Sequence, residues 1–189
     1  YYAAEDDLEA TDERDAWLAV AQFMVGNRKE GGRRLRSLQR TSLELRKQIL
    51  DAADLASADS PEPKGEEDGQ GKSVETASAD KPVNVDELKR RVKRLGRLTA
   101  RVAAAAAAVR GDAAAVEKHA KLADLDRLMQ SQWLARAKNL EAAQKLAEDV
   151  VRGSRGEVLP LAVLTHILWQ RDNKEEAKKR FEELRKVAH

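Results

Sequence analysis

Asn-Leu-Glu-Ala-Ala-Gln-Lys-Leu-Ala-Glu-Asp-Val, residues 139–150, aligns with Asn-Lys-Glu-Glu-Ala-Lys-Lys-Arg-Phe-Glu-Glu-Leu, residues 173–184. In both stretches a small residue, Ala143 or Ala177, follows the asparagine at the same distance. The two stretches lie 34 residues apart, and this period is typical of helix–turn–helix repeats. A weaker third copy near the N-terminus is formed by Asn27, Gly31, Leu35 and Leu38. The sequence therefore predicts a surface built from repeated pairs of helices.

The composition favours long helices over sheets. Charged residues make up 36% of the chain and aromatic residues only 4%, and alanine dominates the apolar set. No run of about 18 apolar residues is present, so no membrane-spanning helix is expected. The absence of cysteine excludes disulfides and thiolate metal sites but leaves the cellular compartment open. Because the chain begins with Tyr1 and ends inside a helical pattern, we interpret it as a processed chain or a piece of a larger protein.

The first half of the chain predicts three helices. Residues 1–11 are acidic and are expected to fray, and Thr11 or Asp12 can cap a helix that ends at Gly26. A second helix is predicted over residues 28–54, and a third begins after Asn84, whose spacing to Glu87 resembles a capping box. Both of these helices carry apolar residues at intervals of three and four. Their matching seams predict that they form an antiparallel hairpin.

Residues 57–84 lack any helical pattern and mix prolines, glycines and serines with acidic residues. Such a segment cannot bury enough apolar surface to offset its chain entropy, so we expect a disordered acidic linker. The predicted organisation is an N-terminal helical hairpin over residues 1–56, this linker, and further helical hairpins over residues 85–189. Gly111 is expected to end the third helix, and Asp112 to cap the next one. The pattern leaves open whether that next helix breaks near Asp124.

Residues 125–189 resemble two divergent tetratricopeptide repeats. Ala143 and Ala177 match the small positions at which the paired helices of that family cross, and Phe181 matches the bulky position one turn later. The usual aromatic pair on the first helix is missing, and Ala147 is smaller than the family pattern. The resemblance implies an all-α fold of antiparallel hairpins and a noncatalytic scaffold that binds a protein or peptide. The alternative is that any alanine-rich helical hairpin places small residues at its crossings.

No set of residues indicates a reaction. The three histidines, His119, His166 and His189, have no partners at metal-ligand spacing, and no serine lies in a nucleophile elbow. We therefore expect no enzyme activity, no cofactor and no bound metal. The three tryptophans are expected to anchor the core between stacked helices: Trp17, Trp133 and Trp169.

The charges are strongly segregated, and this segregation provides the candidate site residues. Seven acidic residues lie in residues 1–15, and seven basic residues without any acid lie in residues 89–101. One stripe of basic residues on the third predicted helix consists of Lys89, Lys93, Arg97 and Arg101. A similar stripe on the second predicted helix consists of Arg33, Arg36 and Arg40, with Lys47 beyond them.

Such stripes can bind nucleic acid or an anionic surface, which is the alternative function. They can also be solvated faces whose charge is balanced by acidic segments of the same chain. The acidic linker is a candidate shield that would cover residues 89–101 at low salt. The lack of interleaved aromatic residues favours the solvated-face interpretation.

Overall fold

The computed structural model describes residues 2–58, 84–154 and 157–188, and this part of the chain is helical throughout, without a strand. The predicted all-α class is confirmed. The helices in chain order are α1 (Tyr2–Met24), α2 (Arg28–Ala58), α3 (Val85–Arg110), α4 (Ala113–Ala123), α5 (Arg127–Arg136), α6 (Leu140–Gly153), α7 (Val158–Gln170) and α8 (Lys174–Val187). None of the described helices combines the length and the hydropathy needed to cross a membrane.

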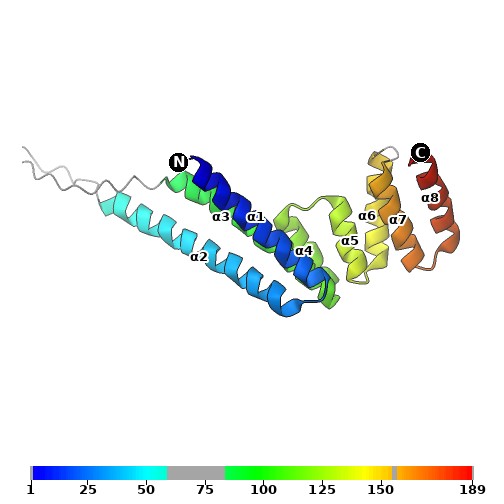
Figure 1. Cartoon of the computed structure of the whole chain (residues 1–189), viewed down its shortest axis with the longest axis horizontal. Helices are drawn as coiled ribbons and strands as arrows, with labels where there is room; N and C mark the ends of the chain where they lie inside the picture. Colours follow the sequence, from blue (N-terminus) through cyan, green and yellow to red (C-terminus); the bar gives the residue numbers. More distant parts are fainter. Residues whose placement is uncertain (1, 59–83, 155–156, 189) are drawn as a thin grey trace, which may run out of the picture.

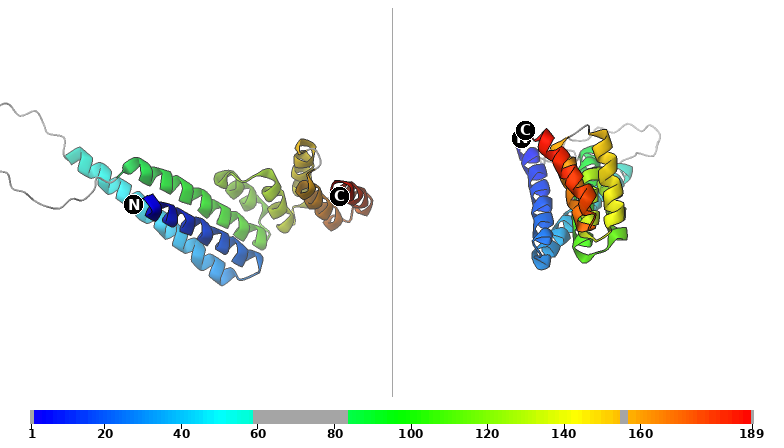
Figure 2. Two further views of the ribbon diagram at one scale, coloured as in Figure 1. Left: turned by 45° about the horizontal axis from the view of Figure 1, so that its top comes forward. Right: turned by 90° about the vertical axis from the view of Figure 1, so that its right-hand side faces the viewer.

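The three long helices form a bundle in which α1, α2 and α3 all contact one another. Helix α2 runs antiparallel to both α1 and α3, and the shorter helices extend from one end of the bundle (Figures 1 and 2). Helix α4 packs on α3, α6 on α5, and α8 on α7, while α6 also contacts α7. Helix α5 contacts both α3 and α7, so the first helices of the three successive pairs lie in a row.

One turn geometry recurs at the α1–α2, α3–α4, α5–α6 and α7–α8 junctions. The residue before each helix cap has a positive φ: 86° at Gly26, 82° at Gly111, 67° at Lys138 and 60° at Asp172. The next residue, an asparagine or aspartate, donates its backbone N–H to a carbonyl five residues back, at 2.8 to 3.0 Å. Left-handed residues of this kind close helix C-termini. The predicted caps at Asn84 and Asp112 are present, and Asp124, with φ 53°, separates α4 from α5.

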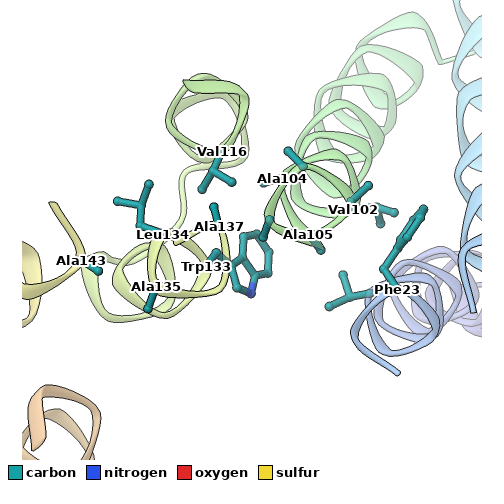
Figure 3. Close-up of a cluster of buried hydrophobic side chains, with 14 of the residues drawn as sticks. Phe23, Val102, Ala104, Ala105, Val116, Trp133, Leu134, Ala135, Ala137 and Ala143 are labelled. Atoms are coloured by element: carbon teal, nitrogen blue, oxygen red, sulfur yellow. The ribbon is translucent and has the colours of Figure 1, made fainter. Parts of the chain in front are cut away.

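Trp133 of α5 joins the bundle to the shorter helices. Its side chain is almost completely buried and points toward α3 near Ala105 (Figure 3). The alanine run at the C-terminal end of α3 is buried from Ala104 to Ala108, which allows α1, α4 and α5 to approach the α3 backbone closely. Close packing of this kind depends on small side chains, because protein interiors leave few voids.

Several predictions about single elements are wrong. Helix α1 begins at Tyr2 rather than near Thr11. The side chain of Asp12, predicted as a possible cap, instead pairs with Arg91 of α3, and Glu13 pairs with Arg94. Residues 57 and 58, assigned to the linker, still belong to α2. The rest of the predicted disordered linker, residues 59–83, lies outside the described residues, and so does its proposed shielding role.

Two of the three tryptophans do not anchor the core. Trp133 does, but Trp17 is 40% exposed and Trp169 is 57% exposed. Phe181 is 51% exposed, although its neighbour in the repeat pattern, Ala177, is buried as predicted. The reason is that α8 packs against α7 and against no other described helix. The face of α8 that carries Phe181 therefore has no described helix to cover it.

Candidate binding surfaces

A groove of about 320 Å³ lies between α5 and α7. Its apolar lining includes Ala135, Val163 and Ile167, which are buried or nearly so, and the half-buried Ala162. Its polar lining consists of four exposed side chains: Gln132, Arg136, His166 and Gln170. No acidic residue is among the described residues that line it. The groove thus combines an apolar floor with walls that can form hydrogen bonds.

The polar side chains of this groove are only partly occupied by contacts within the chain. Arg136 donates a hydrogen bond from Nη2 to the carbonyl oxygen of Met24 at 3.1 Å, which ties the C-terminal end of α5 to the end of α1. The Nε2 atoms of Gln170 and His166 are 2.8 Å apart. The amide oxygen of Gln170 forms no hydrogen bond with the described residues and can still accept one. The side chain of Gln132 forms no hydrogen bond with the described residues.

These groove residues follow the 34-residue offset. Gln132 of α5 corresponds to His166 of α7, and Arg136 corresponds to Gln170. Corresponding positions of two consecutive helix pairs therefore face the same groove. The sequence reasoning missed these residues because it applied the offset only to the second helix of each pair. The same offset, extended to the first helix, would have found them.

The predicted basic residues of α2 do lie together. Arg33, Arg36 and Arg40 line one hollow of about 360 Å³ between α1 and α2, with Ser37 and Arg34 beside them. Two of the guanidinium groups in the hollow already have carboxylate partners. Arg33 forms a two-pronged pair with Glu30 at 2.7 and 2.8 Å, and Arg34 lies 3.0 Å from both Asp15 and Glu30.

Arg36 and Arg40, the other two arginines of this hollow, form no ion pair with the described residues. The Arg33 guanidinium also affects the titration of its partner. Its hydrogen bond is the largest cause holding the pKa of the Glu30 carboxyl below its usual value of 4.5.

The predicted stripe on α3 is not continuous. Lys89, Lys93 and Arg97 are exposed, and Lys89 lies 3.6 Å from Asp86 of the same helix. The half-buried Arg101 is turned toward α1, where its guanidinium lies over the ring of Trp17.

Other arginines of α3 also face α1. Arg91 pairs with Asp12 at 3.3 Å, and Arg94 pairs with Glu13 at 3.1 Å. Much of the basic charge of α3 therefore holds the bundle together, and no residue of α3 lines the hollow on α2.

Within the described residues, no group of three or more histidine, aspartate and glutamate side chains could hold a metal ion. Hollows among the described residues include the groove on α5 and α7, the arginine hollow on α1 and α2, a groove that involves α2, α3 and α4, and one lined by residues of α6, α7 and α8. Comparison with known proteins adds no assignment: no family model, no curated protein and no solved structure matches the chain.

Proposed function

We propose that this chain is a noncatalytic helical-repeat scaffold that binds an extended peptide segment of a partner protein between α5 and α7. The observation that carries the proposal is that Gln132 and His166, and likewise Arg136 and Gln170, occupy corresponding repeat positions and line one groove. A repeat protein builds its binding face in this way, by presenting the same position of each unit on one side. The tetratricopeptide-like reading of residues 125–189 belongs to this proposal.

The recurrence of the turn geometry supports the repeat interpretation. Four junctions share a left-handed residue, a capping asparagine or aspartate and the same backbone hydrogen bond. The fourth residue after each cap is buried, and these residues are Gly31, Val116, Ala143 and Ala177. One of these junctions lies between α3 and α4, where the sequence comparison had not placed a copy.

The chemistry of the groove suits an extended peptide more than a helix. An extended segment exposes backbone N–H and C=O groups that must find partners when they leave water. Gln132 and Gln170 provide amide groups that can both donate and accept, and Arg136 provides a cationic donor. Because no acidic side chain lines the groove, a peptide that carries a carboxylate suits it best.

A selection from a library of random linear peptides tests the proposal. Peptides enriched on the wild-type chain should bind the variant Ala162→Glu at least about tenfold more weakly, because the new side chain occupies the groove and repels a carboxylate. The matched control is Ala114→Glu, which places the same charge at an exposed position of α4 outside the groove. Equal binding to both variants, or the absence of any enriched peptide, would contradict the proposal.

A second candidate function is binding to a polyanion such as nucleic acid at the arginine hollow. It rests on Arg36 and Arg40, which face the hollow without a carboxylate partner among the described residues. Contacts with phosphates release counterions, so binding should weaken steeply as salt rises. The test is a titration of single-stranded RNA at two salt concentrations with the wild type, with Arg36→Glu and, as the control, with Lys145→Glu on α6. Peptide binding between α5 and α7 should depend much less on salt, because it involves far fewer charges.

A further inference from the structure

We propose that the groove of about 470 Å³ between α2, α3 and α4 docks an amphipathic α-helix of a partner protein. The partner helix would present a small residue to Gly96 and acidic residues to the basic rim of the groove. This surface is separate from the groove between α5 and α7, and the two grooves share no residue. The inference therefore goes beyond the proposed peptide-binding function.

The first observation is a glycine that the packing of the chain itself does not explain. Gly96 lies in the interior of α3, where glycine is less favourable than alanine. A Cβ atom added there would have no neighbour within 4 Å, so neither close packing nor a left-handed backbone requires glycine. Together with Ala100 and Ala103, one and two turns later, it leaves a smooth strip along the groove. A second helix can approach such a strip closely.

The second observation is independent of this strip and concerns polar atoms. Ser42 of α2 is only 7% exposed and lines the groove, and its side chain forms no hydrogen bond with the described residues. On the facing helix, the buried hydroxyl of Thr99 has no hydrogen-bond partner either. Buried hydroxyl groups are normally hydrogen-bonded. The buried, unpartnered hydroxyl of Thr99, with the side chain of Ser42 lining the same groove, points to a ligand that carries a polar group there.

The walls of the groove explain why the ligand should be a helix. Leu43 of α2 is 65% exposed and Leu122 of α4 is 60% exposed, and both border the groove. These leucine side chains offer no hydrogen-bond partners to the backbone groups of an extended peptide. A helix satisfies its backbone internally and presents only side chains, so it can enter an apolar groove and offer one serine or asparagine to Ser42 and Thr99.

The positive charge around the groove favours a partner helix that carries acidic residues on either side of its apolar face. Arg46 and His119 line it, and no acidic residue is among its described lining residues. Lys93 and Arg97 are exposed on α3 on either side of Gly96 in the sequence. Acidic residues beside the apolar face of the partner helix would complement this positive rim. Electrostatic complementarity of this type contributes to specificity and to the rate of association.

The probe for the test is a displayed library of single amphipathic helices with acidic flanks and a randomised apolar face. Helices selected on the wild-type chain should carry a small residue at the centre of that face. The variant Gly96→Leu should weaken their binding about tenfold or more, because the new side chain fills the strip. Its thermal midpoint should stay the same or rise, since the position has open space and leucine favours the helix.

The matched control is Gly153→Leu at the end of α6, where an added Cβ atom also meets nothing within 4 Å. It should leave binding unchanged, and so should Ala162→Glu in the other groove. Charge reversal with Arg46→Glu should weaken binding at low salt, and helices with lysine flanks should bind this variant better than the wild type. Loss of random-peptide binding in the Ala162→Glu variant concerns the proposed peptide-binding function of the α5/α7 groove, and it does not test the helix-docking proposal.

Three outcomes would overturn the proposal. The first is a library that yields no binding helix, and the second is a set of helices that bind Gly96→Leu as tightly as the wild type. The third is self-association through this groove. If sedimentation shows that the wild-type chain self-associates and that Gly96→Leu abolishes this, the groove is an interface between copies of the chain.

Discussion

The guanidinium of Arg101 lies over the indole ring of Trp17, with 4.9 Å between its Cζ atom and the ring centroid. This contact links α3 to α1 and removes one member from the basic stripe that the sequence indicated. A cation over an aromatic face contributes about 0.5–1 kcal/mol at a partly exposed site. We therefore expect a double-mutant cycle with Arg101→Ala and Trp17→Leu to give a coupling of this size in urea unfolding. Strict additivity of the two substitutions would show that the contact contributes nothing to stability.

Two adjacent glycines of α2 should respond in opposite ways to alanine. A Cβ atom at Gly31 would lie 2.9 Å from Cδ2 of the buried Phe23 ring, whereas one at Gly32 would meet only Nη1 of Arg36, at 3.5 Å. Gly31→Ala should therefore cost about 1–3 kcal/mol through overpacking. Gly32→Ala should stabilise the chain by up to about 1 kcal/mol through helix propensity. Urea unfolding of the two variants measures both effects. A stabilised Gly31→Ala variant would mean that α1 and α2 approach each other less closely than described.

The crossing of α7 and α8 should not tolerate a large residue at Ala177, which is 1% exposed. Ala177→Leu should lower the free energy of unfolding by about 1–3 kcal/mol, because the helices have no space for the added side chain. The exposed Ala114 of α4 is the matched control, and Ala114→Leu should change stability by less than about 0.5 kcal/mol. Thermal unfolding monitored by circular dichroism is sufficient, and an unchanged midpoint for Ala177→Leu would refute this register.

The pair between Arg33 and Glu30 gives a pH dependence with a defined sign. The hydrogen bond from Arg33 holds the pKa of Glu30 below 4.5 in the folded state. A depressed carboxyl pKa contributes stability that is present above the usual pKa and is lost as pH falls through the folded value. The wild type should therefore be more stable than Glu30→Gln at pH 7, and the difference should shrink below pH 4.5. A difference that grows on acidification would contradict this assignment.

Helix boundaries with a local physical cause could be read from the sequence. The caps Asn84 and Asp112 and the helix-ending Gly111 act through neighbouring backbone groups, so their roles follow from residue type and position. The start of α1 could not be read in this way. Asp12, which the sequence offered as a possible helix cap, pairs instead with Arg91, 79 positions away, and a tertiary contact of this kind cannot be read from local propensity.

The burial of individual large residues could not be predicted from the sequence either, because it depends on which helices pack against each other. Periodicity showed that Ala177 and Phe181 share one side of α8, but not that the helix packs on α7 alone. The candidate groove between α5 and α7 was within reach, since the 34-residue offset relates Gln132 to His166. The groove of α2, α3 and α4 was not, because its residues come from three helices whose mutual packing is set by tertiary contacts.

The most direct test of the scaffold account is to locate a selected peptide on the chain. A peptide enriched from the random linear library would be titrated into the isotopically labelled full chain, and amide chemical shifts would be followed by NMR. The account predicts that the largest perturbations fall on residues 132–136 of α5 and 162–170 of α7, and that Ala162→Glu abolishes them. Perturbations confined to other helices, or spread evenly over the chain, would contradict it.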